Sequence, residues 1–173
     1  RAIKRRPGTK SSKRMPLSIH GLKSVLAAIS SGFTVHAHMI DDFLAAILLG
    51  FYAMLRISEF TNFYTSVHDG SREASRSDIR FFGPPEDPDG FKFVVKVSKT
   101  TQFRTIQTLT LFKSPDPTIC PVRAMHRLCD SDPRAGSSPL FDFTRRTHNV
   151  TDRTVGFGLL SSDEMNIIFG YAY

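Results

Sequence analysis

The chain has 173 residues, of which 40% are hydrophobic, and this is enough apolar sequence for one domain with a buried core. No apolar run reaches the roughly 18 to 20 residues that a membrane-spanning helix needs, and the basic N-terminus lacks the apolar stretch of a signal peptide. Cys120 and Cys129 lie nine residues apart, without metal-ligand spacing. We therefore expect reduced thiols in an intracellular protein, with no metal and no cofactor.

The formal net charge of +7 lies entirely in an N-terminal arm, residues 1–15. The arm holds seven basic residues and no acid, which leaves 16 of the 23 basic residues to balance the 16 acidic ones. Such a segment buries little surface, and it suits either a DNA-tracking role through counterion release or a solvated linker or nuclear-import signal. The candidate DNA-binding residues of the arm are Arg1, Lys4, Arg5, Arg6, Lys10, Lys13 and Arg14.

Two helices are predicted after the arm. Ser18 can cap the first, in which apolar residues recur at helical spacing over residues 19–29. The second, residues 39–57, is the longest apolar stretch, and Asp41 and Asp42 fall near its first turn, where a helix dipole favours acids. Because this segment is apolar on most sides, we expect it to be the central buried helix.

The middle of the chain predicts a small antiparallel sheet of two or three strands. A turn with three prolines and two glycines occupies residues 83–90, between alternating or apolar segments. The predicted strands are residues 78–82, 91–98 and 105–112. A short helix over 122–130 and an apolar anchor at 140–143 follow, so the order of elements predicts a mostly helical α+β domain.

Arg56 and Glu59 stand at the end of the most apolar predicted helix. A guanidinium is charged at every physiological pH, so burying it without a partner is expensive. Glu59 follows three residues later and could form an ion pair that closes the helix end. Alternatively, Arg56 points outward to an anion, because its planar fork matches a phosphate, and Glu59 orients it.

Lys99 lies in the predicted hairpin between the second and third strands, with Arg104 nearby. A lysine at a hairpin tip is often there for solubility alone. Together with Arg56 on a rigid helix, however, it could hold one phosphate from two directions, as phosphoryl transfer requires.

Five ordered blocks resemble the catalytic domain of the tyrosine recombinases, the phage-integrase-like superfamily, in its eukaryotic mobile-element form. The blocks are KRMPLSIHGLKSVL, AMLRISEF, SDIRFF, VKVSKTTQFRTIQTLTL, and CPVRAMHRL followed by SSPLFDF. They run from about residue 12 to about residue 143. The resemblance implies helices around a small antiparallel sheet, and double-stranded DNA as the partner.

The reaction that the resemblance implies is DNA strand transfer without metal or ATP. A tyrosine attacks a phosphodiester, forms a 3′-phosphotyrosine and frees a 5′-hydroxyl. In this chain Arg56 would grip the phosphate, Glu59 would orient the guanidinium, and Lys99 would protonate the leaving oxygen.

The sequence departs from the family pattern after residue 143. It contains no His-x-x-Arg box, and the remaining candidates for the nucleophile, Tyr171 and Tyr173, stand at the very end. We therefore expect a C-terminally truncated domain over 16–143, a divergent tail over 144–173, and no strand cleavage by this chain alone. A truncated domain should also leave part of the helix over 39–57 uncovered, as an apolar patch of roughly several hundred Å².

Three functions remain open at this stage. The chain is an incomplete DNA strand transferase, a DNA-binding module without chemistry, or an interaction protein left from a mobile element. The first two imply an intracellular, nuclear protein of DNA recombination or integration, and they leave open a homo-oligomer on DNA.

Overall fold

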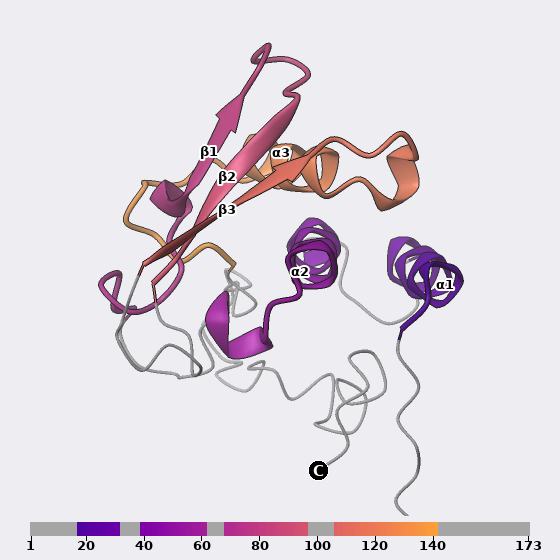
Figure 1. Cartoon of the computed structure of the whole chain (residues 1–173), viewed down its shortest axis with the longest axis horizontal. Helices are drawn as coiled ribbons and strands as arrows, with labels where there is room; N and C mark the ends of the chain where they lie inside the picture. Colours follow the sequence, from indigo (N-terminus) through magenta and orange to yellow (C-terminus); the bar gives the residue numbers. More distant parts are fainter. Residues whose placement is uncertain (1–16, 32–38, 62–67, 97–105, 142–173) are drawn as a thin grey trace, which may run out of the picture.

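The structure is a computed structural model, which describes residues 17–31, 39–61, 68–96 and 106–141. In these ranges three α-helices accompany one three-stranded antiparallel sheet, so the predicted α+β class is confirmed (Figure 1). The elements are α1 (Ile19–Ser30), α2 (Ile40–Ala53), η2 (Ile57–Glu59), η3 (Arg76–Asp78), β1 (Ile79–Phe82), β2 (Gly90–Val95), β3 (Gln107–Phe112), η4 (Pro117–Ile119) and α3 (Pro121–Ser131). None of the helices in the described ranges is long and apolar enough to cross a bilayer.

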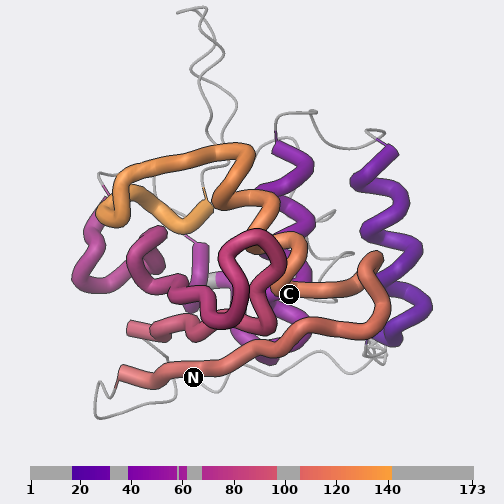
Figure 2. The backbone as a smooth tube through the Cα atoms, turned by 90° about the horizontal axis from the view of Figure 1, so that it is seen from above, coloured from indigo at the N-terminus to yellow at the C-terminus, as the bar shows by residue number. Residues whose placement is uncertain are grey.

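Helices α1 and α2 run side by side, and α2 lies between α1 and the sheet (Figures 1 and 2). As predicted, the Ser18 hydroxyl caps α1 by accepting a hydrogen bond from the Gly21 backbone N–H at 3.1 Å. One stripe of α1, formed by Leu22, Leu26 and Ile29, is buried. Helix α1 is therefore a peripheral amphipathic helix that packs on one face only.

Helix α2 is the central buried helix, as its apolar sequence predicted. Every residue from Asp42 to Leu49 is buried, and Asp41 and Asp42 stand in the first turn. Two expectations for this helix are wrong. It ends at Ala53 rather than at residue 57, and it is covered along most of its length, so the expected large uncovered apolar patch is absent from this described helix.

The sheet is a meander of order β1-β2-β3, with strand positions close to those predicted. Its register pairs Phe81 with Phe91 and Phe91 with Leu111. Because side chains alternate along a strand, these residues and Phe93 form the inner face, which packs towards α2 and α3. The opposite face carries polar, basic and a few aromatic side chains.

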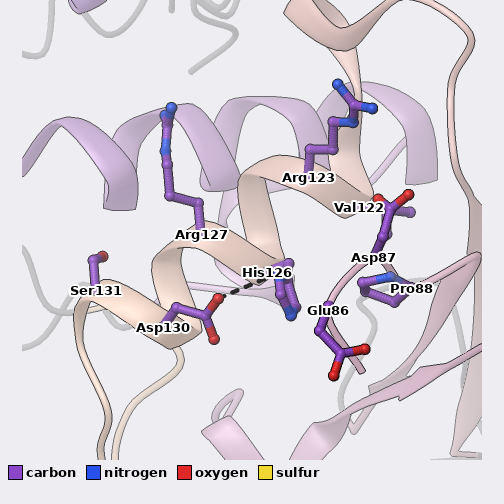
Figure 3. A pocket seen from close by; sticks show the side chains of 9 residues that line it. All are labelled: Glu86, Asp87, Pro88, Val122, Arg123, His126, Arg127, Asp130 and Ser131. Atoms are coloured by element: carbon purple, nitrogen blue, oxygen red, sulfur yellow. Dashed lines mark ion pairs between the residues drawn. The ribbon is translucent and has the colours of Figure 1, made fainter. Parts of the chain in front are cut away.

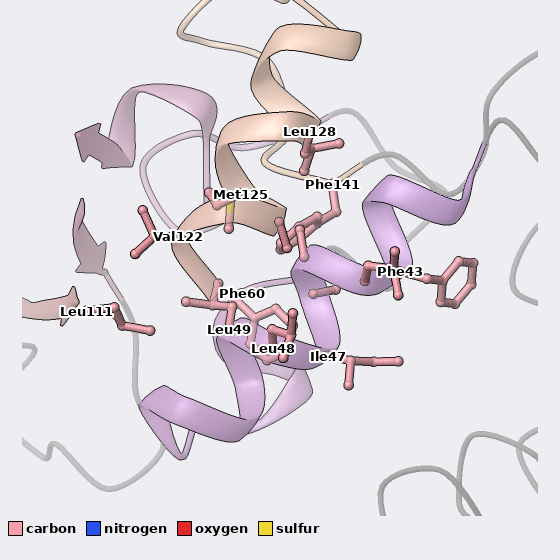
Figure 4. Packing of buried hydrophobic residues seen from close by; sticks show 14 of the residues in the cluster. Phe43, Ile47, Leu48, Leu49, Phe60, Leu111, Val122, Met125, Leu128 and Phe141 are labelled. Atoms are coloured by element: carbon pink, nitrogen blue, oxygen red, sulfur yellow. The ribbon is translucent and has the colours of Figure 1, made fainter. Parts of the chain in front are cut away.

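Helix α3 closes the core over the sheet and α2. Figure 4 shows Met125 and Leu128 of α3 pointing into the same apolar cluster as Leu49 of α2 and Leu111 of β3. The predicted apolar anchor at 140–143 is confirmed for its described part, because Leu140 and Phe141 are both buried. Segments far apart in sequence are thus joined by one core.

Candidate nucleic-acid interface

The chain turns sharply where α2 ends. Met54 adopts the left-handed conformation, with φ of 52°, and the Leu55 N–H donates to the Gly50 carbonyl at 3.1 Å. A residue with a Cβ pays about 1 kcal/mol or more for this conformation. Since the Met54 side chain is 91% exposed, its own packing does not compensate for that strain. The following residues must hold the turn.

Phe60 is the anchor that holds this turn. Its ring is fully buried and makes an edge-to-face contact with Phe141, at 6.0 Å between ring centroids. It also lies so close to α2 that a Cβ added at Gly50 would be 3.1 Å from the Phe60 Cζ atom. The close fit of Phe60 against Gly50 therefore fixes η2, which lies just before it, relative to the core.

Arg56 and Glu59 form the predicted pair, but in a 3₁₀ turn rather than on the face of α2. The buried Glu59 carboxylate accepts a hydrogen bond from the Arg56 backbone N–H at 2.9 Å and contacts the guanidinium Nη1 at 3.5 Å. The Glu59 side chain is 8% exposed, whereas that of Arg56 is 46% exposed. The carboxylate thus fixes the arginine backbone, while most guanidinium donors stay open to solvent.

The turn that carries Arg56 lies at one particular end of the sheet. Val95, the last residue of β2, pairs with Gln107, the first of β3, so these strands share an end. In the view of Figure 1, the purple turn after α2 lies towards this shared end rather than towards the turn between β1 and β2.

Several predicted site residues lie outside the described residues. These are Lys99 and Arg104 between β2 and β3, Tyr171 and Tyr173 near the end of the chain, and the seven basic residues of the arm. Of the predicted catalytic residues, the structure brings together Arg56 and Glu59.

A second cation–carboxylate site, which sequence reasoning missed, lies where β2 ends. The Lys96 ammonium contacts the Asp78 carboxylate at 2.6 Å and donates to the carbonyls of Gly70 at 2.6 Å and Glu73 at 3.2 Å. Asp78 also accepts from the Ser75 N–H at 2.7 Å. The spacing of Ser75 and Asp78 matches a capping box and was the one signal in the sequence for this site.

His68, Glu73 and Ser75 have the connectivity of a hydrolase triad. The two ring nitrogens of His68 lie 3.0 Å from a Glu73 carboxylate oxygen and 3.1 Å from the Ser75 hydroxyl. However, Ser75 is buried and its hydroxyl also accepts from Lys96 at 3.3 Å. A nucleophile needs access to substrate, so this network stabilises the loop before β1 rather than forming an active site.

A pocket of about 460 Å³ lies between α3 and the turn that joins β1 to β2 (Figure 3). His126 and Asp130, one turn apart on α3, contact each other at 3.3 Å, and Arg123 projects beside Asp87. A hydrogen bond from Lys113 lowers the pKa of Asp87, which stays anionic. Carboxylates and cations therefore line this pocket together.

Among the described residues, no group of histidine, cysteine, aspartate or glutamate has the arrangement of a metal site. Comparison with known proteins finds no matching family model, no matching curated protein and no matching solved structure. The function must therefore be argued from the residues themselves.

Proposed function

We propose that this chain binds double-stranded DNA through a phosphate site centred on Arg56. One observation about the Arg56–Glu59 pair carries the proposal. The Glu59 carboxylate is buried, whereas the Arg56 guanidinium that it orients is half-exposed. In the Lys96–Asp78 pair, by contrast, both groups are largely enclosed. Among the described residues, the Arg56 guanidinium contacts Glu59 alone, which leaves donors that match the oxygens of a phosphate.

The strained turn at Met54 supports the same proposal. A left-handed non-glycine residue persists only where its surroundings hold it, and such strain collects at binding sites. In this chain the strain places Arg56 outside the helix, where the guanidinium can approach a ligand as wide as DNA. A simple continuation of α2 would instead have kept residue 56 on the helix.

Lys99 would supply the second charge of this site. It stands four residues after Val95, and four extended residues span at most about 14 Å, so chain length keeps its Cα within that distance of the end of β2. In our proposal Lys99 and Arg56 approach one phosphate from two directions, with Arg104 and the basic arm contacting neighbouring phosphates. This arrangement is the one that the resemblance to the tyrosine recombinases implies.

We propose binding without strand cleavage. The sequence has no His-x-x-Arg box to provide the second arginine of the family site, and loss of one such charge donor lowers the rate by about 10²–10³. Tyr171 and Tyr173 are the late tyrosines available as nucleophiles. The proposed role is that of a nuclear DNA-binding protein related to DNA recombination and integration.

Binding can be tested with a labelled duplex by fluorescence anisotropy over a series of salt concentrations. Arg56→Gln should weaken binding roughly 10- to 100-fold, the loss expected for one charge-assisted contact, and should lower the salt slope by about 0.9. Arg123→Gln removes another exposed arginine, on α3, and should leave both values close to those of the unchanged chain. Equal effects of the two variants would refute a specific site at Arg56.

Cleavage can be tested separately with a duplex that carries a nick beside the scissile position. A recombinase traps itself covalently on such a substrate, and denaturing electrophoresis then shows a protein–DNA adduct. We expect salt-sensitive binding without an adduct. An adduct would show an active enzyme, and absence of any DNA affinity at moderate salt would favour the interaction protein.

A further inference from the structure

The outer face of the sheet carries two cations that stand directly opposite each other. Arg80 on β1 pairs in register with Lys92 on β2, and both side chains are exposed. Like charges in this arrangement destabilise a sheet. The neighbouring residue on β3 is Thr110, and no acidic side chain stands on this face among the described strand residues. The sheet therefore presents an uncompensated positive charge.

An aromatic pair occupies the next row of the same face. The rings of Phe82 and Phe112 meet edge to face at 5.8 Å between centroids, above Gly90. Gly90 is required there, because an added Cβ would lie 2.4 Å from the Phe82 Cζ atom. The Phe112 ring is nevertheless 67% exposed, so the pair does not bury it. Exposure of a phenylalanine beside paired cations has no stabilising role within the described fold.

We propose that this face, defined by Arg80, Lys92, Phe82 and Phe112, binds a single strand of nucleic acid. A base stacks on the exposed Phe112 ring, and a flanking phosphate lies between Arg80 and Lys92. Rows of one sheet face are about 7 Å apart, a spacing at which a stacked base and its own backbone can engage both rows. Stacking surfaces beside basic side chains are the usual means of binding unpaired strands.

Charge complementarity selects this occupant over others. An apolar protein surface would bury two cations without partners, which is costly. A duplex would satisfy the cations through its backbone, but its stacked bases would not reach the Phe112 ring. A second copy of the chain would bring Arg80 and Lys92 against the same two cations. A single strand uses the cations and the ring together.

This inference goes beyond the duplex site at Arg56, and the two can fail independently. The probe is a labelled oligothymidine of about 12 nucleotides, within the usual range of site sizes, measured by anisotropy. Phe112→Leu should weaken binding roughly 5- to 150-fold. The double variant Arg80→Gln with Lys92→Gln, which removes the contact with one phosphate, should lower the salt slope for the single strand by about 0.7. Phe112→Leu should leave duplex binding unchanged, because the stacked bases of a duplex do not reach that ring.

Two matched controls separate this face from general surface effects. Tyr52→Leu removes another exposed aromatic ring, on α2, and Arg123→Gln removes another exposed arginine, on α3. Both should bind oligothymidine as the unchanged chain does, and circular dichroism should show all variants folded. The proposal is overturned if Phe112→Leu and Tyr52→Leu behave alike. It is also overturned if sedimentation shows that Phe112→Leu dissociates a dimer, because the face would then join two copies.

Discussion

Two cation–carboxylate pairs in this protein use the same chemistry in opposite ways. At the end of β2, Lys96 is 17% exposed and Asp78 is 8% exposed, and the ammonium is enclosed by a carboxylate and backbone carbonyls. At the turn after α2, Glu59 is as buried as Asp78, but Arg56 is 46% exposed. The carboxylates are equivalent, and the cations are not.

The difference lies in what each cation can still bind. An ammonium has three donors, and Lys96 directs them to oxygens of its own chain. A guanidinium has five, and the described contact of Arg56 is the long one, at 3.5 Å, to Glu59. A saturated cation stabilises a loop, whereas an oriented and unsaturated one can bind a ligand. Lys96 is therefore a structural charge, whereas Arg56 remains open to solvent.

The largest effect is expected when Phe60, which anchors the turn that carries Arg56, is removed. Phe60→Ala should lower the free energy of unfolding by about 4 kcal/mol, because a buried ring is replaced by a cavity between Gly50 and Phe141. Urea titration measures this loss. Phe112→Ala, which truncates an exposed ring, should cost less than about 1 kcal/mol. A similar cost for both variants would mean that Phe60 does not anchor the turn.

The next largest effect is expected for the enclosed pair of Lys96 and Asp78. Asp78→Ala should lower the free energy of unfolding by about 3 kcal/mol, because it leaves a largely buried ammonium and the Ser75 N–H without their carboxylate. Arg56→Gln should change the same quantity by about 0.5 kcal/mol or less, since its charge is already half in water. If denaturant titrations give the two variants equal losses, the distinction between the pairs does not hold.

A smaller effect, of opposite sign, is expected at the strained turn. Met54→Gly should raise the free energy of unfolding by about 0.5–1 kcal/mol, because glycine adopts the left-handed conformation without a Cβ penalty. The exposed side chain contributes little packing that could be lost. Tyr52→Gly, two residues earlier and inside α2, should instead be destabilising. Thermal unfolding of the two variants in parallel measures both changes. A lower midpoint for Met54→Gly than for the unchanged chain would contradict the prediction.

The smallest effect is expected for an ion pair at the surface. Lys23 on α1 contacts Asp116 beside η4 at 2.6 Å, and this contact, with a hydrogen bond from Thr118, lowers the pKa of Asp116 from 3.8 to about 2. A lowered carboxyl pKa adds stability above pH 4 that is lost as pH falls towards 2. Urea titrations from pH 5 to pH 2 should show this contribution in the unchanged chain and not in Asp116→Asn. A pH-independent difference between the two proteins would contradict the assignment.

Much of the fold could be predicted from local sequence patterns. The serine cap and apolar spacing of α1, the proline-rich turn between β1 and β2, and the alternation along the strands all act within a few residues. Such signals depend only on local backbone geometry and on which face of an element is apolar. They can therefore be recognised without knowing which other element that face packs against. The pairing of Arg56 with Glu59 was also predictable, because residues three apart meet in any helical turn.

The sequence did not reveal where α2 ends or what surrounds Lys96. The last residues of the predicted helix favour helix, yet packing of Phe60 against Gly50 and Phe141 forces Met54 into a left-handed turn. Lys96 meets carbonyls more than 20 residues earlier in the chain, a contact that no spacing rule anticipates. Both outcomes arise from contacts between distant segments, which override local preference.

The amino-acid sequence was enough to identify the charged residues, the stretches that form helix or strand, and the shared turn of Arg56 and Glu59. Whether Lys96 or Arg56 is enclosed could be seen only in the folded structure, because it depends on carbonyls, rings and strands from distant parts of the chain. The same packing turned Arg80 and Lys92 to one exposed face beside Phe112. The sequence shows where the charged residues are, but the fold decides which of them are open to a ligand.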